Sequence, residues 1–494
     1  MRLTLLLEMA ADGFGERTLI GRRAEGITAA DLAARARAGA AVIRERGADA
    51  IVYLGLNGPA FPVALFAAAY AGVPLVPLNY RLGSAQLDGL LAKHPKALGI
   101  ADTPGLGRLA AAGIDGLTPD GWLRLTENDA PELEEPADGP AVIIYTSGTT
   151  SEPKGVLLRH GNLVSYVLQT VEFGAAGEDD AALVAVPPYH IAAVANVITN
   201  LYAGRRTITL ETFSPADWLG TVRDEGVTNA LIVPTMLARI VESGASPGIP
   251  TLRSLAYGGA PMPSSLIERA LELWPDVGFV NAYGLTETSS TIALLGPDDH
   301  RAAAASTDDA ARARLSSVGR PVPGVEIEIR GASGEVVPPG VPGRICVRGD
   351  QVSAEYAGVG RMVDERGFFD TRDEGYLDDE GYLFIGGRAD DTIIRGAENI
   401  APAEIEDVLL RHPAVQDAVV VGLPDEVWGQ RIGAVVVTGA WGVEPEDLRA
   451  FARASLRSSK TPEEIWFWPE LPRTETGKLI RRTVLQRLLG EKSA

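Results

Sequence analysis

Apolar and polar residues follow a repeating order in the first part of the chain. Between Thr28 and Asn79 the pattern predicts a helix, a strand, a second helix and a second strand. These segments are residues 29–47, 50–56, 59–72 and 73–79. The same order returns over residues 216–260 and 264–296, where short apolar strands precede glycine, proline or a helical stretch. Such alternation of helices and strands favours parallel α/β layers.

The pattern changes between about residues 318 and 386. Glycine and proline become frequent there, and apolar residues alternate with polar ones, which indicates an antiparallel sheet or a distorted barrel. A last block begins near Asp391, with an amphipathic segment at residues 402–415, two strands and a further helix. We predict a small mobile α+β domain in this last block.

The composition is typical of a large folded protein. A chain of 494 residues exceeds one hydrophobic core, and about 150 residues per domain indicates roughly three core-sized units. Apolar residues make up 46% of the chain and charged residues 22%, so the chain should fold throughout. The net charge of −20 is spread widely, without a run of Lys and Arg that could follow a nucleic-acid backbone. Nucleic-acid binding is therefore not expected.

Cysteine and histidine usage excludes several kinds of site. The one cysteine, Cys346, excludes an internal disulfide and a cysteine-based zinc site, and we expect it to be buried in a strand. The five histidines show no close metal-ligand spacing. The apolar start is too short for a signal peptide, and the longest apolar run, 61–78, contains glycine and proline. These features predict a soluble, cytoplasmic protein without a membrane span.

The strongest local signal is AVIIYTSGTTSEPKGV, at residues 141–156. A short apolar run leads into a hydroxyl-rich loop that ends at Lys154 and Gly155. Small residues let backbone N–H groups approach phosphate oxygens, hydroxyls add donors, and a lysine offsets charge. The loop is not a Walker A motif, because Lys154 is not followed by Ser or Thr. Composition alone would allow a plain surface loop, but the pattern is also that of a polyphosphate-binding cradle.

This segment closely resembles the signature of the acyl-adenylate-forming (AMP-binding) superfamily, which includes acyl-CoA synthetases, aryl-CoA ligases, luciferases and peptide-synthetase adenylation domains. Further motifs of that family follow in the same order. They are PPYHIAAV at 187–194, YGGAP at 257–261, NAYGLTET at 281–288, TRDEGYLDDEGYLFIGGRADDTIIRGAENIAPAEIE at 371–406 and LPRTETGKLIRR at 471–482. The resemblance spans nearly the whole chain and favours the acyl-CoA synthetase and aryl-CoA ligase branch.

The resemblance implies a fold and a reaction. The fold would be α/β, with a large N-terminal domain of two α/β subdomains plus a distorted β-barrel over residues 1–389, and a small mobile α+β domain over 390–494. The reaction would join a carboxylic acid to ATP, giving acyl-AMP and pyrophosphate, and then pass the acyl group to a thiol with release of AMP. The implied cofactors are ATP and Mg²⁺, with coenzyme A as co-substrate.

Such a reaction needs cations near the acyl oxygen and the phosphates, together with a metal ligand. By resemblance, Lys478 bridges the substrate carboxylate and the α-phosphate, Thr286 contacts the α-phosphate, and Glu287 binds Mg²⁺. The Gly258 segment would form the adenine wall, with Tyr283 packed on adenine, and Asp373 with Arg388 would hold the ribose. The full set expected to bind ATP or AMP is Thr146, Ser147, Gly148, Thr149, Thr150, Lys154, Gly258, Gly259, Ala260, Asn281, Ala282, Tyr283, Gly284, Asp373 and Arg388.

The resemblance also implies how the small domain works. Asp390 matches the hinge about which the domain rotates between adenylation and thioester formation. The loop after the hinge would face the thiol in the second state. The residues expected on the coenzyme A side are Arg395, Gly396, Ala397 and Glu398.

Two positions depart from the usual family pattern. Ser151 stands where the phosphate loop usually has glycine, and Arg372 stands in the middle of a ribose motif that usually reads Thr-Gly-Asp. We expect ATP binding to survive the first change. Asp373 is retained beside the second, so its role is kept.

The acyl pocket is expected around residues 190–196, 257–260 and 281–288. Small residues dominate these windows, and no Lys or Arg falls in them, which favours an apolar acid over a dicarboxylate or an amino acid. An aryl, an arylpropenoic and a medium-chain fatty acid all fit, with a slight preference for the aryl acids. His190 would gate the pocket or orient the carboxylate. The residues expected to line the pocket are His190, Ala193, Asn196, Tyr257 and Gly258.

Two other functions remain open on sequence alone. A stand-alone enzyme could load a carrier protein or hand the adenylate to another nucleophile. A non-catalytic nucleotide-binding homologue is disfavoured because the residues matched to catalysis are present. The expected partners are therefore a small carboxylic acid, ATP, and coenzyme A or a carrier protein. The sequence does not determine an oligomeric state, although a homodimer is compatible with it.

Overall fold

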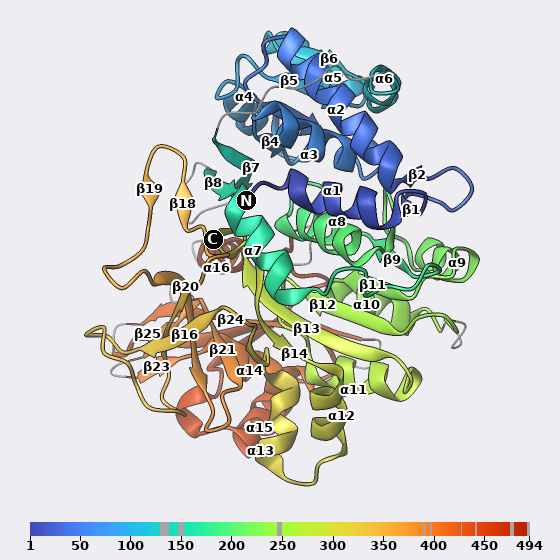
Figure 1. The fold of residues 1–494 in the computed structure, drawn as a ribbon. Helices are drawn as coiled ribbons and strands as arrows, with labels where there is room; N and C mark the ends of the chain where they lie inside the picture. The colour runs from blue at the N-terminus through green and yellow to red at the C-terminus, as the bar shows by residue number, and fades with distance from the viewer. Residues whose placement is uncertain are drawn as a thin grey trace.

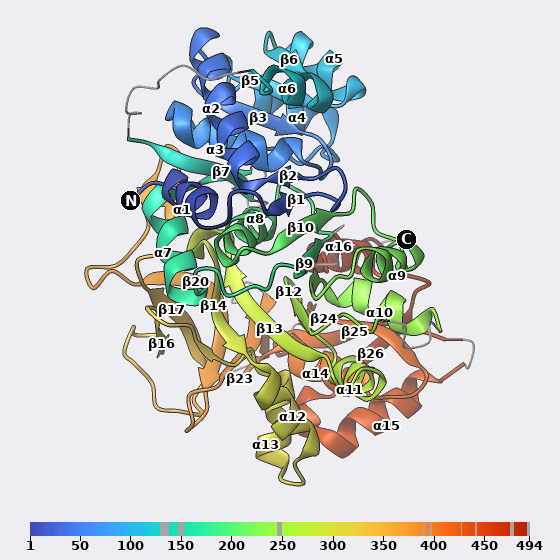
Figure 2. The same cartoon turned by 45° about the vertical axis from the view of Figure 1, so that its right-hand side comes forward.

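The computed structural model has a large N-terminal part and a small C-terminal part (Figure 1). Both views place the blue lobe at the top, the green lobe below it and most of the orange C-terminal part lower still, with helix α16 (Arg481–Glu491) level with the green lobe (Figures 1 and 2). The structure describes residues 1–128, 138–146, 153–244, 249–388, 391–395, 398–425, 427–439, 442–474 and 479–491. Over these residues, no helix is long and apolar enough to cross a bilayer.

The first sheet forms the blue lobe and continues toward the centre of the molecule. Counted over the described residues it has eight strands, in the order β19-β18-β8-β7-β4-β3-β5-β6. The strands are β3 (Ile51–Leu54), β4 (Leu75–Pro77), β5 (Leu98–Ala101), β6 (Asp115–Leu117), β7 (Pro140–Thr146), β8 (Lys154–Arg159), β18 (Glu355–Tyr356) and β19 (Gly360–Arg361). Its helices are α2 (Ala29–Glu45), α3 (Ala60–Ala71), α4 (Ser84–Leu91), α5 (Thr103–Ala111) and α6 (Pro119–Leu125). The pairs of β3 with β4 and β5 are parallel, as the alternation predicts.

The second sheet has nine strands among the described residues, in the order β15-β14-β13-β12-β11-β9-β10-β1-β2. The strands are β1 (Thr18–Ile20), β2 (Ile27–Thr28), β9 (Ala181–Val184), β10 (Arg206–Thr209), β11 (Asn229–Ile232), β12 (Ser254–Gly258), β13 (Gly278–Leu285), β14 (Ser290–Leu295) and β15 (Arg320–Pro321). The helices that go with it are α1 (Thr4–Phe14), α7 (His160–Thr170), α8 (Ile191–Ala203), α9 (Pro215–Asp224), α10 (Pro234–Glu242), α11 (Ser264–Leu273), α12 (Pro297–Ala305) and α13 (Asp309–Ala313).

A shared hydrophobic core joins the two sheets. Helices α1, α3 and α8 contribute buried apolar residues to one cluster, which also includes residues of β3 and β7. Ten of the twelve residues of α3 are buried, as its nearly continuous apolar sequence predicts. The two sheets are therefore held in a fixed arrangement, and the ends of their strands can face one space.

The third sheet is the antiparallel unit that the glycine- and proline-rich stretch predicts. Its order is β16-β17-β20-β21. The strands are β16 (Glu326–Arg330), β17 (Gly343–Arg348), β20 (Phe369–Leu377) and β21 (Leu383–Arg388). Cys346 lies in β17 and is 3% exposed, which confirms the expectation of a buried strand residue.

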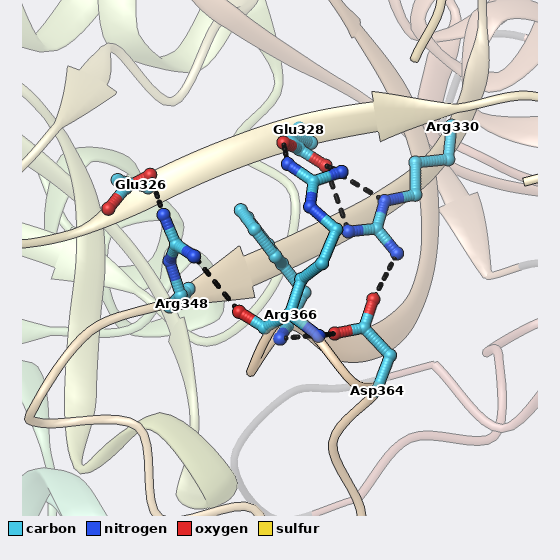
Figure 3. Close-up of polar contacts among 7 residues, drawn as sticks. Glu326, Glu328, Arg330, Arg348, Asp364 and Arg366 are labelled. Carbon is cyan, nitrogen blue, oxygen red and sulfur yellow. Dashed lines mark hydrogen bonds and ion pairs between the residues drawn. The ribbon is translucent and has the colours of Figure 1, made fainter. Parts of the chain in front are cut away.

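Charged side chains form a network of hydrogen bonds and ion pairs beside this sheet (Figure 3). The guanidinium groups of Arg330, Arg348 and Arg366 lie 4.7, 4.6 and 5.1 Å from the ring centroid of Phe368. Arg330 also donates to Asp364 over 2.6 Å. All of these residues lie outside the cavity described below, so we assign the cluster a structural role.

The C-terminal part is a compact α+β unit with its own two hydrophobic clusters. Its sheet has five described strands, in the order β23-β22-β25-β24 with β26 paired to β25. The strands are β22 (Ile393–Arg395), β23 (Glu398–Ile400), β24 (Val415–Asp425), β25 (Gly429–Thr438) and β26 (Glu464–Phe467). The helices are α14 (Pro402–Leu410), α15 (Pro445–Ser455) and α16 (Arg481–Glu491).

Candidate active site

A cavity of ≈2030 Å³ lies where the strand ends of both large sheets meet the third sheet and the C-terminal part. The ends of β7 and β8 contribute to its wall, as do β12, β13, helix α8 and the turn between β13 and β14. Residues on both sides of Lys478 also line it. The carboxyl ends of parallel strands are where α/β proteins bind ligands.

The phosphate loop begins and ends at this cavity. Strands β7 and β8 pair antiparallel, with Thr146 opposite Lys154, and both residues line the cavity. Pairing of the flanking strands therefore fixes the two ends of the loop at one place. The expected phosphate ligands Ser147, Gly148, Thr149 and Thr150, and the departing Ser151, lie outside the described residues.

Strand β12 presents only one of its faces to the cavity. Gly258 lines it, whereas Tyr257 is fully buried and its hydroxyl lies 2.7 Å from Nε2 of His300. Successive side chains of a strand point to opposite faces, so neighbouring residues cannot both face the ligand. The expectation that Tyr257 lines the pocket is corrected on this point. Ala256 lines the cavity instead.

Successive residues of β13 also alternate between the cavity and the opposite face of the sheet. Ala282 and Gly284 line the cavity, whereas Asn281 donates to the carbonyl of Ser317 over 3.0 Å. Tyr283 does not line the cavity either, and its hydroxyl donates to Asp373 over 2.5 Å. Asn281 and Tyr283, which were expected at the nucleotide, therefore lie behind the residues that line the cavity.

Backbone atoms approach closely at the β12 end. A methyl group on Gly258 would lie 2.3 Å from the carbonyl oxygen of Ala282, so this position excludes a side chain. Gly259 follows with a φ of +80°, which glycine adopts at low cost, and it also lines the cavity. Ala260 is absent from the lining.

One face of helix α8 lines a long part of the cavity wall. His190 is its N-cap residue and lines the cavity, and its ring lies 4.7 Å from that of Tyr189. Asn196, further along the same helix, also lines it, as expected. Ala193 is 2% exposed and packs in the core, because it lies on the opposite helical face, so its expected place in the pocket is corrected. Ala192 and Ala195 line the cavity in its place.

Glu287 and Thr286 lie in the short turn after β13, and both line the cavity. The hydroxyl of Tyr356 donates to Oε1 of Glu287 over 2.9 Å. Burial, followed by the Glu287 carboxylate, raises the pKa of Tyr356. Tyr356 therefore keeps its proton and holds the carboxylate in place, a role that the motif comparison did not reveal.

Asp373 and Arg388 form an ion pair across β20 and β21. Nε of Arg388 lies 3.0 Å from Oδ1 of Asp373, and the two residues are direct partners in the sheet register. Asp373 is 6% exposed and also accepts the hydrogen bond from Tyr283. Burial, and then the Asp373 charge, raises the pKa of Tyr283. Arg388 and Thr371 line the cavity, so the pair lies at its edge.

Arg372 has an unusual backbone conformation beside this pair. Its φ is +61°, in the left-handed region that favours glycine, and its side chain is exposed and lines the cavity. The usual family pattern has glycine here, so the fold keeps the glycine conformation although the residue has changed.

The C-terminal part contributes to the cavity through the chain on either side of Lys478. Thr474, Leu479 and Ile480 line the cavity, and Arg473 and Leu479 form an antiparallel bridge. Lys478 itself lies outside the described residues, as does the expected hinge residue Asp390. The described residues on both sides of Lys478 therefore lie at the cavity.

The residues expected on the coenzyme A side lie elsewhere. Arg395 and Glu398 face each other in the β22–β23 hairpin, and neither lines the cavity. Arg395 pairs with Glu463 over 2.6 Å and lies over the ring of Trp428. Gly396 and Ala397 lie outside the described residues.

Comparison with known proteins gives a consistent result. Residues 7–357 match the family of AMP-binding enzymes, and residues 404–478 match the AMP-binding enzyme C-terminal domain. The chain belongs to the AMP-binding enzyme family. This confirms the resemblance inferred from the motifs, and the relatives place this AMP-binding enzyme in the branch of acyl-CoA and aryl-CoA synthetases.

Individual relatives of this AMP-binding enzyme cover nearly its whole length. It is 35% identical over 453 residues to a feruloyl-CoA synthase from Amycolatopsis sp, covering 90% of this chain and 89% of the relative. It is 33% identical over 468 residues to a fatty acid–[acyl-carrier-protein] ligase from Streptomyces coeruleorubidus, covering 90% and 87%. A solved structure of o-succinylbenzoate coenzyme A synthetase from Bacillus subtilis, with ATP and magnesium, matches with a TM-score of 0.83 at 30% identity, over 97% of this chain and 99% of that one.

The donor set of this AMP-binding enzyme fits Mg²⁺ held together with a substrate. Mg²⁺ takes oxygen ligands and is usually bound through one or two carboxylates plus substrate phosphates. Glu287 supplies such a carboxylate at the cavity. Among the described residues, no group of three or more His, Cys, Asp or Glu could hold a metal without a substrate.

Several arginines line the cavity although the sequence motifs did not indicate them, among them Arg81, Arg205 and Arg320. Arg205 lines it but lies between the windows searched for the acyl pocket. Those windows contain no Lys or Arg, and the preference for an apolar acid depended on that observation. No sequence motif marks Arg205. It lies at the cavity because helix α8, which ends just before it, runs along the cavity wall.

Proposed function

We propose that the protein is an ATP-dependent carboxylic acid–CoA ligase that works through an acyl-adenylate. In the first step the acid's carboxylate oxygen bonds to the α-phosphorus of ATP, and the bond to pyrophosphate breaks. In the second, a thiol bonds to the acyl carbon and AMP leaves. The main support is that one cavity connects the phosphate-loop ends, Glu287 and Arg388 with a long chamber along α8.

The chain's own residues would divide the work as follows. Lys154 and the loop before it would bind the phosphates, and Thr286 would contact the α-phosphate. Asp373 and Arg388 would hold the ribose, and Lys478 would bridge the carboxylate and the α-phosphate. Lys478 belongs to a segment whose flanking residues line the cavity, which supports its assignment to adenylation.

Glu287 would hold Mg²⁺, with Tyr356 fixing its carboxylate. When bound, Mg²⁺ would offset the charge of the phosphates and favour departure of pyrophosphate.

We further propose that the chain works as two units, residues 1–389 and 390–494, with the hinge at Asp390. Thr474 and Leu479, on either side of Lys478, line the cavity whereas Arg395 and Glu398 do not, and this arrangement fits the adenylation step. Rotation about the hinge would then bring the β22–β23 hairpin to the cavity for the thiol step. Asp390→Pro should slow thioester formation from supplied acyl-AMP and spare adenylation, and unchanged thioester formation would remove the hinge assignment.

The substrate class that we propose is an aryl, arylpropenoic or medium-chain fatty acid. Feruloyl-CoA synthase and the fatty acid–[acyl-carrier-protein] ligase among the relatives support this range. The latter also supports a second candidate, in which the acceptor is a carrier-protein thiol.

Mass spectrometry of the products tests the acceptor. The purified chain is incubated with ATP, Mg²⁺ and each acid, with and without coenzyme A. An acyl-CoA product, with AMP and pyrophosphate, is the expected result. Acyl-AMP that accumulates and is not consumed by coenzyme A would favour the carrier-protein alternative.

A further inference from the structure

The acyl chamber follows helix α8 to its C-terminal end. The α8 residues that line it are Ile191, Ala192, Ala195, Asn196, Thr199, Asn200 and Ala203, which lie on one helical face. The opposite face packs into the core. At about 1.5 Å per residue, Ala192 and Ala203 are roughly 16 Å apart along the helix axis. The chamber therefore reaches well beyond His190.

The far end of this chamber is polar. The segment after α7 lies beside the end of α8, where the amide of Ala176 donates to the carbonyl of Ala203 over 2.9 Å. Asn200 of α8 and Arg205, which follows the helix, line the cavity at this end, and Glu172 of the segment after α7 also lines the cavity. An apolar acid would leave the buried Nε of Arg205 without a hydrogen-bond partner, which is costly.

Arg205 stands out among the arginines at this end. Arg206 forms an ion pair with Glu225 over 2.7 Å, and Arg17 donates to the backbone carbonyls of Ala176 and Gly204. In contrast, Nη1 of Arg205 donates to Oδ1 of Asn200 over 3.0 Å, and its Nε is buried with no hydrogen-bond partner among the described residues.

The charge of Arg205 is also unbalanced. Within the described part of the chain, no carboxylate forms an ion pair with it, although the protein has 65 acidic residues. Burial lowers the pKa of the guanidinium, which remains charged. A charged donor that is partly desolvated in a substrate chamber is suited to an anionic ligand group.

We propose that Arg205, with Asn200 holding its guanidinium, binds an oxygen at the far end of the substrate, most strongly a second carboxylate. The inference rests on the proposed function, because the chamber must accept an acid. It changes the expected substrate from a wholly apolar acid to an elongated acid with an oxygen at the end opposite the reacting carboxylate. An extended chain advances roughly 1.2 Å per bond, so 16 Å corresponds to about thirteen bonds.

The test compares acids of equal length that differ only at the far end. The series contains monoacids, ω-hydroxy acids and α,ω-diacids of about eight to fourteen carbons, chosen to bracket that span. Arylpropenoic acids with and without a para oxygen are added. Acid-dependent ATP–pyrophosphate exchange gives kcat/KM for each acid. We expect the diacid to exceed the matched monoacid by about tenfold or more at the best length.

Substitutions of Arg205 test whether this residue causes the preference for diacids over monoacids. Arg205→Met should remove the advantage of the diacid and leave kcat/KM for monoacids unchanged or raised, and Arg205→Lys should retain part of it. Arg239→Met is the matched control, because Arg239 lies on α10 over the ring of Phe213, outside the cavity. A ratio of diacid to monoacid that Arg205→Met leaves unchanged would overturn the proposal, as would a preference for monoacids at every length.

Calorimetry of the same acids separates this inference from the proposed function. Binding needs no turnover, so it reports on Arg205 even if no acid is adenylated. Tighter binding of the diacid, lost in Arg205→Met, would support the inference whatever the exchange assay shows. Equal binding of both acids to the unmodified chain would contradict it, even if both were adenylated.

Discussion

Arg388 and Asp373 face each other across two neighbouring strands, with Nε of Arg388 3.0 Å from Oδ1 of Asp373. The hydroxyl of Tyr283 donates to the other carboxylate oxygen. The carboxylate is thus oriented before any ligand binds. Orientation of this kind lowers the entropy lost on binding.

Asp373→Asn tests the proposed role of this carboxylate at the ribose. We expect KM for ATP to rise by about tenfold or more, because hydrogen bonds to a charged group contribute roughly 1.5–3 kcal/mol. Steady-state kinetics with varied ATP measures the change. Asp364→Asn is the matched control, since Asp364 also pairs with an arginine but lies outside the cavity (Figure 3). A KM that is the same in both variants would contradict the ribose role.

Lys478→Ala separates the two half-reactions. Adenylate formation should fall by at least about a thousandfold, since a positioned cation at the reacting centre contributes strongly to rate. Thioester formation from supplied acyl-AMP should persist, because the α-phosphate bond is already made. Rapid-quench assays of each half-reaction give the two rates. If both rates fell together, the assignment of Lys478 to adenylation would be wrong.

Arg372→Gly should stabilise the fold. The left-handed conformation at φ +61° costs a non-glycine residue about 1 kcal/mol, and glycine removes that cost. Urea unfolding should therefore show a gain of up to about 1 kcal/mol, smaller if the added freedom of the unfolded chain offsets it. Arg344→Gly in β17 should instead destabilise, because Arg344 has a strand backbone that does not require glycine and its side chain pairs with Asp370. A loss of stability in Arg372→Gly would show that its side chain makes contacts that outweigh the strain.

His160 makes stability depend on pH. Burial, and then Arg2, lowers the pKa of His160 to about 4, while Nδ1 accepts a hydrogen bond from the amide of Leu3. The unfolded chain, with an ordinary histidine pKa of about 6.5, binds the proton more readily. Stability from this group is therefore complete above about pH 6.5 and is lost as the pH falls toward 4, by roughly 1.4 kcal/mol per pH unit at most.

Urea unfolding between pH 7 and pH 5 measures this dependence. His160→Asn keeps an acceptor near the Leu3 amide but has no titrating group, so its loss of stability over this range should be smaller. An equal slope in both proteins would mean that other groups cause the pH dependence.

Much of the fold could be predicted from the sequence because local patterns determine it. The helix expected at 29–47 is α2 (Ala29–Glu45), and the strand expected at 50–56 is β3 (Ile51–Leu54). The antiparallel sheet and the α+β unit at the end follow equally from local alternation and from glycine and proline positions. Strand order within the sheets is not encoded in this way, because it depends on pairing between distant segments.

The site was less predictable, for two physical reasons. Motif windows name neighbouring residues together, but a strand or helix shows only one face to a ligand, so Tyr257 and Ala193 are buried behind the wall. Contacts between distant segments leave no local signal, as with Tyr356 and Glu287. Arg205 was missed for the second reason.

The most direct test of the central claim is ATP–pyrophosphate exchange in the absence of any thiol. Labelled pyrophosphate is incubated with the full chain, ATP, Mg²⁺ and a panel of aromatic acids, aliphatic acids and diacids. The account predicts label in ATP that depends on the acid and disappears in Lys478→Ala. Exchange that needs no acid, or its absence with every acid while the chain is folded and binds ATP, would contradict the claim that this cavity adenylates a carboxylic acid.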